Sequence, residues 1–255
     1  MNLDFLAPGG EATGGGEPPI ARSPMEGQAA AAGARFAVRD GWNLAVNYGI
    51  TSTESEAEGK AARWTCGWAD VSHLAKLELQ GSRSDLGALL STCADGAGLE
   101  FGTATRAADA WWCPLTPTRT LVIGEPAALA SLGPRLAESG PSMSLVDVTT
   151  TLAALTLAGP LAREVFARFS AIDLRPRITP VGALRPGSIA RQPGILICEA
   201  VDRYLFMFGW ATAEYMWSVV ADAGGHLGGR PIGLEMLAEL GGAGGDRSTT
   251  EVARA

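Results

Sequence analysis

The side chains of this chain that could do chemistry are few, and each stands alone. Asp109 is a single carboxylate close to Trp111 and Trp112 and could serve as a general base, but a carboxylate in a loop or at a sheet edge is the favoured interpretation. His73, in a Ser-His pair at the start of an expected strand, could contact a ligand, but a structural hydrogen bond is favoured. The sequence therefore offers candidate residues without a complete catalytic motif.

Motifs for metals, nucleotides and covalent catalysis are absent from the sequence. The two histidines, His73 and His226, are far apart, and no cysteine or carboxylate spacing resembles a metal site. There is no G-x-S-x-G, no Walker loop and no G-x-G-x-x-G between a strand and a helix. We therefore expect no metal, and we expect a flavin or nicotinamide cofactor, if the reaction uses one, on another chain.

Charge and composition favour a cytoplasmic protein that binds another protein or a small molecule. The net charge is -7 without a stripe of Lys or Arg, which argues against a nucleic acid partner. The four cysteines form no Cys-x-x-Cys pair and are expected to be reduced, mostly buried thiols. Neither a secretory signal nor an apolar run of about 18 residues is present, so we expect no membrane association.

Glycine and proline are concentrated at both ends of the chain. Residues 1–20 and 241–255 are predicted to be disordered tails, because such segments bury too little surface to offset the entropy of ordering. Residues 21–240 are predicted to form the folded domain.

An internal repeat lies within the expected domain. One copy reads Asp-Val-Ser from Asp70 and the other Asp-Val-Thr from Asp147, and each continues through a spacer into Leu-Ala-x-Leu-x-Leu-x-Gly. The alternation predicts a strand in each copy. In the first strand Lys76, Glu78 and Gln80 are expected on a solvent-exposed face. The second strand is apolar on both faces, so we expect another element to cover it.

A helix is predicted after each of these strands. Ser82 begins a sequence with the spacing of a capping box, and Pro160 suits the first position of the second helix. Two related strand–helix units predict an α+β fold with ferredoxin-like halves. Further along, residues 194–199 and 203–208 predict a β-hairpin, followed by a helix that Thr212 could cap.

Several segments resemble the aminomethyltransferase (T-protein) family of the glycine cleavage system. They are Gly41-Trp42, Tyr48-Gly49 and the acids Glu54, Glu56 and Glu58; Gly67-Trp68-Ala69-Asp70-Val71-Ser72-His73; and Leu157-Ala158-Gly159-Pro160 with Pro231-Ile232-Gly233-Leu234. Residues 146–149, 170–177 and 185–188 are similar to the gamma subunit of heterotetrameric sarcosine oxidase, from the same superfamily. The resemblance covers roughly residues 22–238 and implies a T-protein-like folate-binding fold that lacks the C-terminal barrel.

The resemblance also implies a folate site. Its candidate substrate-binding residues are Trp42, Tyr48, His73, Leu74, Arg191 and Glu199, with Asp109 as the catalytic candidate. Trp42 and Tyr48 could stack on a pterin or fill the core, and the core is slightly favoured. The paired tryptophans are expected to place one ring outward on a strand, at an interface or a ligand wall.

The departures from the family pattern weaken the expected site. The family's Asp-Asp pair corresponds to residues 108–114, where Asp109 is the one remaining acid, and Leu74 replaces a methionine. Residues 191–195 replace the family's Arg-Thr-Gly-Tyr-Thr-Gly-Glu loop and leave Glu199 as the nearby acid. A pterin needs a carboxylate and a closed cavity, so we expect tetrahydrofolate to bind poorly unless a partner supplies a wall.

Two functional hypotheses follow from the resemblance. The first is a non-catalytic or co-catalytic, gamma-like subunit of a sarcosine-type amine oxidase or demethylase, which docks on flavoprotein oxidoreductase subunits and is linked to tetrahydrofolate one-carbon metabolism. The alternative is a stand-alone tetrahydrofolate-dependent aminomethyl- or methyltransferase. A scaffold without chemistry is a third reading.

Overall fold

The protein is described by a computed structural model over residues 19–49, 58–60, 62–94, 98, 100–137 and 142–244. The predicted tails therefore lie almost entirely outside the described residues, except that the last helix runs to Gly244, past the predicted boundary at residue 240. The elements are, in chain order, β1 (Ala21–Arg22), α1 (Glu26–Ala31), β2 (Ala34–Arg39), β3 (Trp42–Tyr48), β4 (Gly67–Asp70), β5 (Ala75–Gln80), α3 (Arg83–Cys93), β6 (Thr105–Ala107), β7 (Ala110–Thr116), β8 (Arg119–Gly124), α4 (Pro126–Ala137), β9 (Ser144–Asp147), β10 (Leu152–Ala158), α5 (Ala162–Ala167), β11 (Leu184–Ile189), β12 (Gln192–Ala200), β13 (Arg203–Gly209), the 3₁₀ turn η2 (Trp210–Thr212), α6 (Ala213–Gly225), β14 (Arg230–Pro231) and α7 (Leu234–Gly244).

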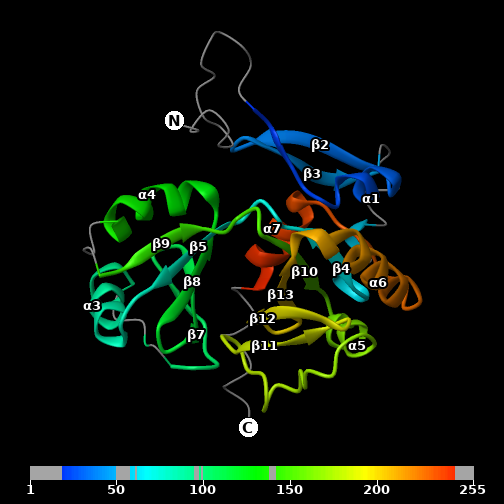
Figure 1. The fold of residues 1–255 in the computed structure, drawn as a ribbon. Helices are drawn as coiled ribbons and strands as arrows, with labels where there is room; N and C mark the ends of the chain where they lie inside the picture. The colour runs from blue at the N-terminus through cyan, green and yellow to red at the C-terminus, as the bar shows by residue number, and fades with distance from the viewer. Residues whose placement is uncertain are drawn as a thin grey trace.

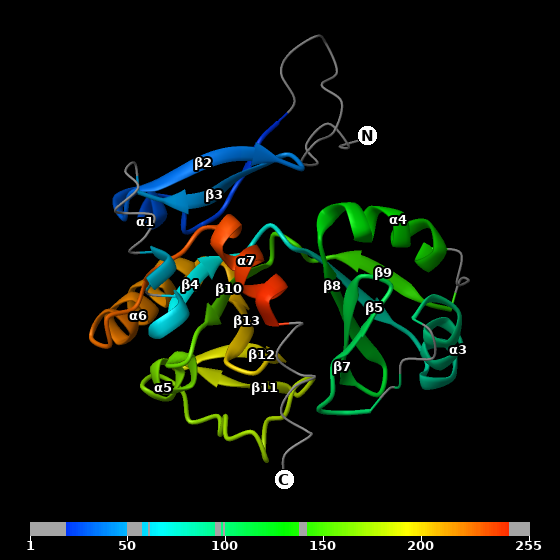
Figure 2. The ribbon, with the colours of Figure 1, turned by 180° about the vertical axis from the view of Figure 1, so that it is seen from behind.

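The strands form three sheets in two lobes with a small cap (Figures 1 and 2). The five-stranded sheet has the order β6-β7-β8-β5-β9 and carries α3 and α4. The six-stranded sheet has the order β11-β12-β13-β10-β4-β14 and carries α5 and α6. The N-terminal sheet, β1-β3-β2, lies across the end of the six-stranded lobe, and α7 lies between the two lobes in both views.

The two lobes are built from related units, which confirms the predicted α+β fold. The first unit runs β5-α3-β7-β8-α4-β9, and the second runs β10-α5-β12-β13-α6. Each unit pairs its first strand with its last hairpin strand, β5 with β8 and β10 with β13. On the other side β5 pairs with β9 and β10 pairs with β4, both antiparallel. This is the β-α-β-β-α-β pattern of a ferredoxin-like unit, with β4 completing the second sheet.

The repeated Asp-Val-Ser/Thr segments have the same geometry in both copies. The Asp70 side chain accepts a hydrogen bond from the Ser72 N–H at 3.0 Å, and the Asp147 side chain accepts one from the Thr149 N–H at 2.8 Å. Both are local turns of the kind that Asp side chains stabilise. The repeat is therefore structural, because each copy folds the backbone back just before the strand of its unit.

Each turn is also bonded to the first strand of the other unit. The Ser72 hydroxyl accepts from the Ala154 N–H in β10 at 3.1 Å, and the Thr149 hydroxyl accepts from the Lys76 N–H in β5 at 3.0 Å. Two backbone hydrogen bonds correspond to each other in the same way. The Val71 N–H donates to Ala154 O, and the Val148 N–H donates to Lys76 O. The two lobes thus cross at one point through reciprocal hydrogen bonds.

Strand side chains alternate between different apolar layers. In β7, Trp111 and Cys113 face the layer between the lobes, while Trp112 faces α3 and α4. The prediction that one of the paired tryptophans faces outward is wrong, because both faces of this sheet are covered and both rings are buried. In β10, Leu155 and Ala154 face opposite buried layers, which confirms that its second face is covered.

The predicted solvent-exposed face of the first repeat strand is wrong at Lys76. This side chain is fully buried at the crossing of the two lobes. Its Nζ donates to Ser72 O at 2.9 Å and to Leu74 O at 2.8 Å. Burial lowers the pKa of Lys76 to about 7, against the opposing effect of Asp70 and Asp147. A neutral amine has two N–H donors, which matches its two carbonyl acceptors.

The predicted helix starts are partly confirmed. Ser82 caps α3 by accepting from the Asp85 N–H at 3.1 Å. Pro160 is not at the first position of α5, because Leu161 is the N-cap. Thr212 precedes α6, but its hydroxyl donates to Gly209 O and caps no helical N–H. The predicted hairpin is present as β12 and β13.

Replacing Lys76 by Met should change how stability depends on pH. The folded pKa of about 7 lies below the unfolded value of about 10.4, so between these values the unfolded chain binds the extra proton and stability rises with pH. The difference in unfolding free energy, wild type minus Lys76→Met, should therefore rise by up to about 1.4 kcal/mol per pH unit between about pH 7 and 10. Urea unfolding followed by tryptophan fluorescence measures it. Parallel pH curves for the two proteins would contradict the buried neutral amine.

Candidate functional site

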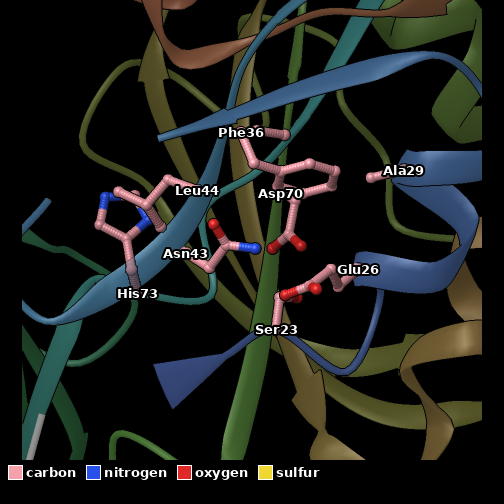
Figure 3. Close-up of a pocket in the computed structure, with 9 residues that line it drawn as sticks. Ser23, Glu26, Ala29, Phe36, Asn43, Leu44, Asp70 and His73 are labelled. Atoms are coloured by element: carbon pink, nitrogen blue, oxygen red, sulfur yellow. The ribbon is translucent and has the colours of Figure 1, made fainter. Parts of the chain in front are cut away.

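A small pocket lies beneath the N-terminal sheet, where β3 passes over the end of β4 (Figure 3). It is lined by Ser23, Glu26, Ala29, Phe36, Asn43, Leu44, Ala45, Asp70 and His73. The space open to the centres of water molecules is about 10 Å³, which is room for about one water. Cavities that hold drug-sized ligands are roughly 300–1,000 Å³, so a pterin does not fit in this pocket.

His73 is the one predicted site residue that lines this pocket. Its side chain is 5% exposed, and Nε2 lies 3.6 Å from the Glu125 carboxylate at the start of α4. The imidazole of His73 lowers the pKa of the Glu125 carboxyl. Nδ1 is buried and has no hydrogen-bond partner among the described residues. The structural role that the sequence favoured for His73 therefore accounts for Nε2, which faces Glu125, but not for Nδ1, which has no partner among the described residues.

Trp42 and Tyr48 lie on β3 and are both buried. The Trp42 ring packs against Trp210, with ring centroids 6.3 Å apart. Tyr48 belongs to the apolar core of the six-stranded lobe, and burial raises the pKa of its hydroxyl. In this arrangement both aromatic rings fill space between elements, which is the reading that the sequence slightly favoured.

Glu58, the described member of the acidic series, joins two segments. It is buried and accepts from the Tyr48 N–H at 3.0 Å and from the Gly233 N–H at 2.6 Å. Glu54 and Glu56 lie outside the described residues. Gly233 approaches β3 so closely that an added Cβ would lie 2.1 Å from Val46 O. The carboxylate of Glu58 therefore serves to hold the start of α7 against the end of β3.

Glu199 lies between the lobes, in a network that the sequence did not reveal. Its Oε1 accepts from Trp111 Nε1 of the other sheet at 3.2 Å, and its Oε2 accepts from Arg203 Nε at 3.0 Å. Arg203 also donates to Leu237 O in α7 at 3.2 Å. The network links both large sheets and α7. The sequence feature that could have indicated this network is the placement of Glu199 and Arg203 on either side of the predicted hairpin turn, where an acid and a base can form a pair.

Asp109 and Arg191 lie on exposed turns of different hairpins. Asp109 has a φ of 57° between β6 and β7, and Arg191 has a φ of 63° between β11 and β12. Such left-handed turn positions favour Asp and Asn, so Asp109 fits the loop interpretation. Leu74 is partly buried against the apolar layer between the lobes. The predicted site residues are thus spread over five places rather than brought to one cavity.

The remaining chemistry-bearing side chains are structural in this arrangement. Among the described residues, no three His, Cys, Asp or Glu side chains are grouped so that they could hold a metal ion. All four cysteines are free and buried, which confirms their expected burial, and burial raises the pKa of Cys66 to about 12. In the same part of the chain, the helices are too short or too polar to cross a membrane.

Replacing Arg203 by Met should destabilise the protein through the network between the lobes. Glu199 would keep its charge in a mostly buried position with Trp111 as its one remaining partner, at a cost of about 1–3 kcal/mol. The double variant Arg203→Met/Glu199→Gln should recover part of that loss, because the unpaired charge is gone. Arg175→Met, which breaks an exposed pair with Asp173, is the control and should leave the urea midpoint unchanged. Equal midpoints for Arg203→Met and wild type would show that the network does not stabilise the fold.

Comparison with known proteins places this geometry in context. No family model matches the chain. A curated aminomethyltransferase from Frankia alni is 26% identical over 237 residues, covering 84% of this chain and 61% of that protein. The glycine cleavage system aminomethyltransferase T from Bartonella henselae has a TM-score of 0.69 at 18% identity, covering 87% of this chain and 62% of its own.

A second solved structure has a similar fold at a different length. One chain of the heterotetrameric sarcosine oxidase from Corynebacterium sp. U-96 superposes with a TM-score of 0.61 at 20% identity. The alignment covers 83% of this chain and 98% of that one, whereas the chain spans about three fifths of the aminomethyltransferases. The resemblance carried by the sequence motifs is confirmed, and the chain has the fold shared by the glycine cleavage aminomethyltransferases and heterotetrameric sarcosine oxidase.

Proposed function

We propose that this chain is a non-catalytic or co-catalytic subunit of a sarcosine-type amine oxidase or demethylase, linked to one-carbon chemistry and working beside flavoprotein subunits. The observation that carries the proposal is the layer between the lobes. In residues 108–114, which the resemblance matches to the family's Asp-Asp stretch, Asp109 is the one acid and lies on an exposed turn, while β7 carries Trp111, Trp112 and Cys113 into the buried layers. The acid that faces Trp111 is Glu199, and both of its oxygens are already bonded.

The same layer argues against a pterin site on this chain alone. A pterin needs a free carboxylate for its ring N–H groups and a closed cavity that excludes water. Here Glu199 is committed to Trp111 and Arg203, and the pocket beside His73 has room for about one water. Neither the layer around Glu199 nor the pocket beside His73 therefore fits a pterin in this arrangement. We assign the folate link to the assembled complex.

A flavin would belong to the partner subunits, since the sequence lacks a dinucleotide-binding fingerprint. The near-complete coverage of a sarcosine oxidase chain supports a subunit role. Exposed apolar side chains offer a contact surface for such a partner. Phe101 is 65% exposed and Val181 is 55% exposed, and their segments are joined by a bridge between Thr103 and Ala183.

Co-expression with the flavoprotein subunits of a sarcosine-type oxidase from the same organism tests the proposal. The chain should elute with them as one assembly that carries flavin absorbance. The variant Phe101→Ser/Val181→Ser should weaken the assembly at least about tenfold, because it removes apolar contact area. Val201→Ser is the matched control, since Val201 is 78% exposed on the turn between β12 and β13. A monomer that binds none of the flavoprotein subunits would overturn the subunit role.

A tetrahydrofolate-dependent transferase is the second candidate, and the similarity to the Frankia alni aminomethyltransferase favours it. Titration of tetrahydrofolate into the isolated chain separates the two, with tryptophan fluorescence as the readout. We expect no micromolar binding, because the interlobe acid is paired and the small pocket is too tight. Micromolar binding together with turnover that Asp109→Ala abolishes would favour the transferase.

A further inference from the structure

The outer edge of β9 is open, although the equivalent edge of the other lobe is covered. β9 is the last strand of the five-stranded sheet, whereas its repeat counterpart β4 has β14 beyond it in the six-stranded sheet. The two strands are in the same register. Asp70 of β4 pairs with Leu155, and Asp147 of β9 pairs with Leu77, which has the same repeat position as Leu155. The duplication therefore produces two matching edges, and in the described part of the chain one of them has no further strand.

The hydrogen bonds of β9 show which of its backbone groups face outward. The Val148 N–H donates to Lys76 O in β5. Because hydrogen bonding alternates along an antiparallel pair, the N–H and C=O groups of Ser144 and Val146 also face β5, and those of residues 143, 145 and 147 point away. In the other lobe, the Ile232 N–H uses the position equivalent to residue 145 by donating to Trp68 O at 2.9 Å. The open edge of β9 thus presents the groups that a further strand would pair with.

β9 also lacks the residues that protect the other sheet edges. Proteins keep edge strands from pairing with other chains by means of proline, cationic side chains or very short strands. In the described part of the chain, the other edge strands all carry an arginine, and two also carry a proline: Arg22 in β1, Arg35 and Arg39 in β2, Arg106 in β6, Arg185 and Pro186 in β11, and Arg230 and Pro231 in β14. β9 reads Ser-Leu-Val-Asp, and its one charged side chain, Asp147, accepts from the Thr149 N–H of its own turn. This edge is therefore both open and unprotected.

A strand seated like β14 does not fit on β9. Ile232 packs over Gly67 of β4, where an added Cβ would lie 2.7 Å from its side chain. In β9 the position equivalent to Gly67 is Ser144, which has a side chain. The occupant of the β9 edge must therefore pair in a different way from β14.

The residues of the β9 edge are complementary to themselves in the antiparallel direction. When Leu145 lies opposite Leu145 of a second copy, Met143 lies opposite Asp147, and Ser144 lies opposite Val146. The outward groups of residues 143, 145 and 147 then exchange hydrogen bonds with those of the second copy. The two Asp147 carboxylates lie at opposite ends of the pairing, so like charges do not face each other.

Other registers use this edge less well. Moving the pairing toward the C-terminal end of β9 calls on the Thr149 N–H, which already donates to Asp147 at 2.8 Å. Moving it further places Asp147 opposite Asp147 of the second copy, and directly opposed like charges destabilise a strand pair. The pairing centred on Leu145 is therefore the favoured register.

We infer that two copies of this chain associate through β9 about a two-fold axis and join their five-stranded sheets into one continuous sheet. The association removes the open edge from both copies, since each copy offers the same surface to the other. Val146, which is 45% exposed, is covered by Ser144 of the second copy. The surface is distinct from that of Phe101 and Val181, so the inference does not depend on the proposed function.

Sedimentation velocity of the full chain tests the association. The paired edge is four residues long, so we expect a weak dimer with a dissociation constant on the order of 10–100 µM. The weight-average mass should rise from 26.3 kDa toward twice that value as the concentration increases to about 200 µM. A mass that stays at 26.3 kDa over this range would overturn the inference, and a strand of another protein would then be the candidate for this edge.

A matched pair of variants locates the contact. Val146 in β9 and Val38 in the edge strand β2 are 45% and 56% exposed, so neither substitution should disturb the core. Val146→Lys should weaken dimerisation at least about tenfold, because it brings two like charges close together across the axis. Val38→Lys should leave the dissociation constant unchanged. A dimer that tolerates Val146→Lys would contradict the assignment.

Amide hydrogen exchange of the wild-type protein keeps the test decisive if Val146→Lys does not fold. The N–H groups of Leu145 and Asp147 point outward, whereas that of Val146 faces β5. Between dilute and concentrated samples, exchange at Leu145 and Asp147 should slow at least about twofold, while exchange at Val146 should stay the same. Exchange rates at Leu145 and Asp147 that do not depend on concentration would overturn the inference, even if the chain dimerises through another surface.

Discussion

Two Asp-Val-Ser/Thr turns hold the lobes together, because each bonds its own backbone and also the first strand of the other unit. Ser72 and Thr149 supply the hydroxyls, and Ala154 and Lys76 occupy the equivalent receiving positions. Backbone groups at this crossing are buried and must be paired, so neither turn can move without breaking bonds in both units. The orientation of the two sheets, and of everything between them, depends on this reciprocal contact.

The apolar layer between the sheets follows from that orientation. Alternation along the strands sends Trp111 and Cys113 from one sheet and Leu205 and Met207 from the other into the same layer, and Leu237 of α7 joins them. A bulky ring at position 111 fills volume at the junction of the lobes. The Trp111–Glu199–Arg203 network satisfies the polar atoms there, which supports an interior used for holding elements together rather than for binding a ligand.

The N-terminal sheet is attached by different means, and the pocket exists because of it. Glu58 holds the end of β3 to the start of α7, and Glu235 of α7 pairs with Arg39 and Asn47 of the same sheet. The sheet then closes over the turn that contains Asp70 and His73. Polar side chains from three segments line the same pocket, and two of their atoms, Glu26 Oε2 and His73 Nδ1, have no hydrogen-bond partner among the described residues.

Local pattern was sufficient for several of the elements. Period-two alternation identified β5, β10 and the β12–β13 hairpin, the Ser82 cap identified the start of α3, and the repeat identified two related units. These signals act within a few residues, so the sequence alone determines them. The superfamily motifs added the overall fold.

Only the tertiary structure decided which faces are covered and which polar groups meet. Lys76 and the paired tryptophans follow ordinary strand alternation, but other elements cover them, so the expected exposed side is absent at these positions, whereas Gln80 at the end of β5 is exposed. The candidate residues Asp109, Arg191, Glu199 and His73 are separated for the same reason. Their positions depend on how the lobes cross and where the N-terminal sheet docks, and these long-range contacts leave no local pattern in the sequence.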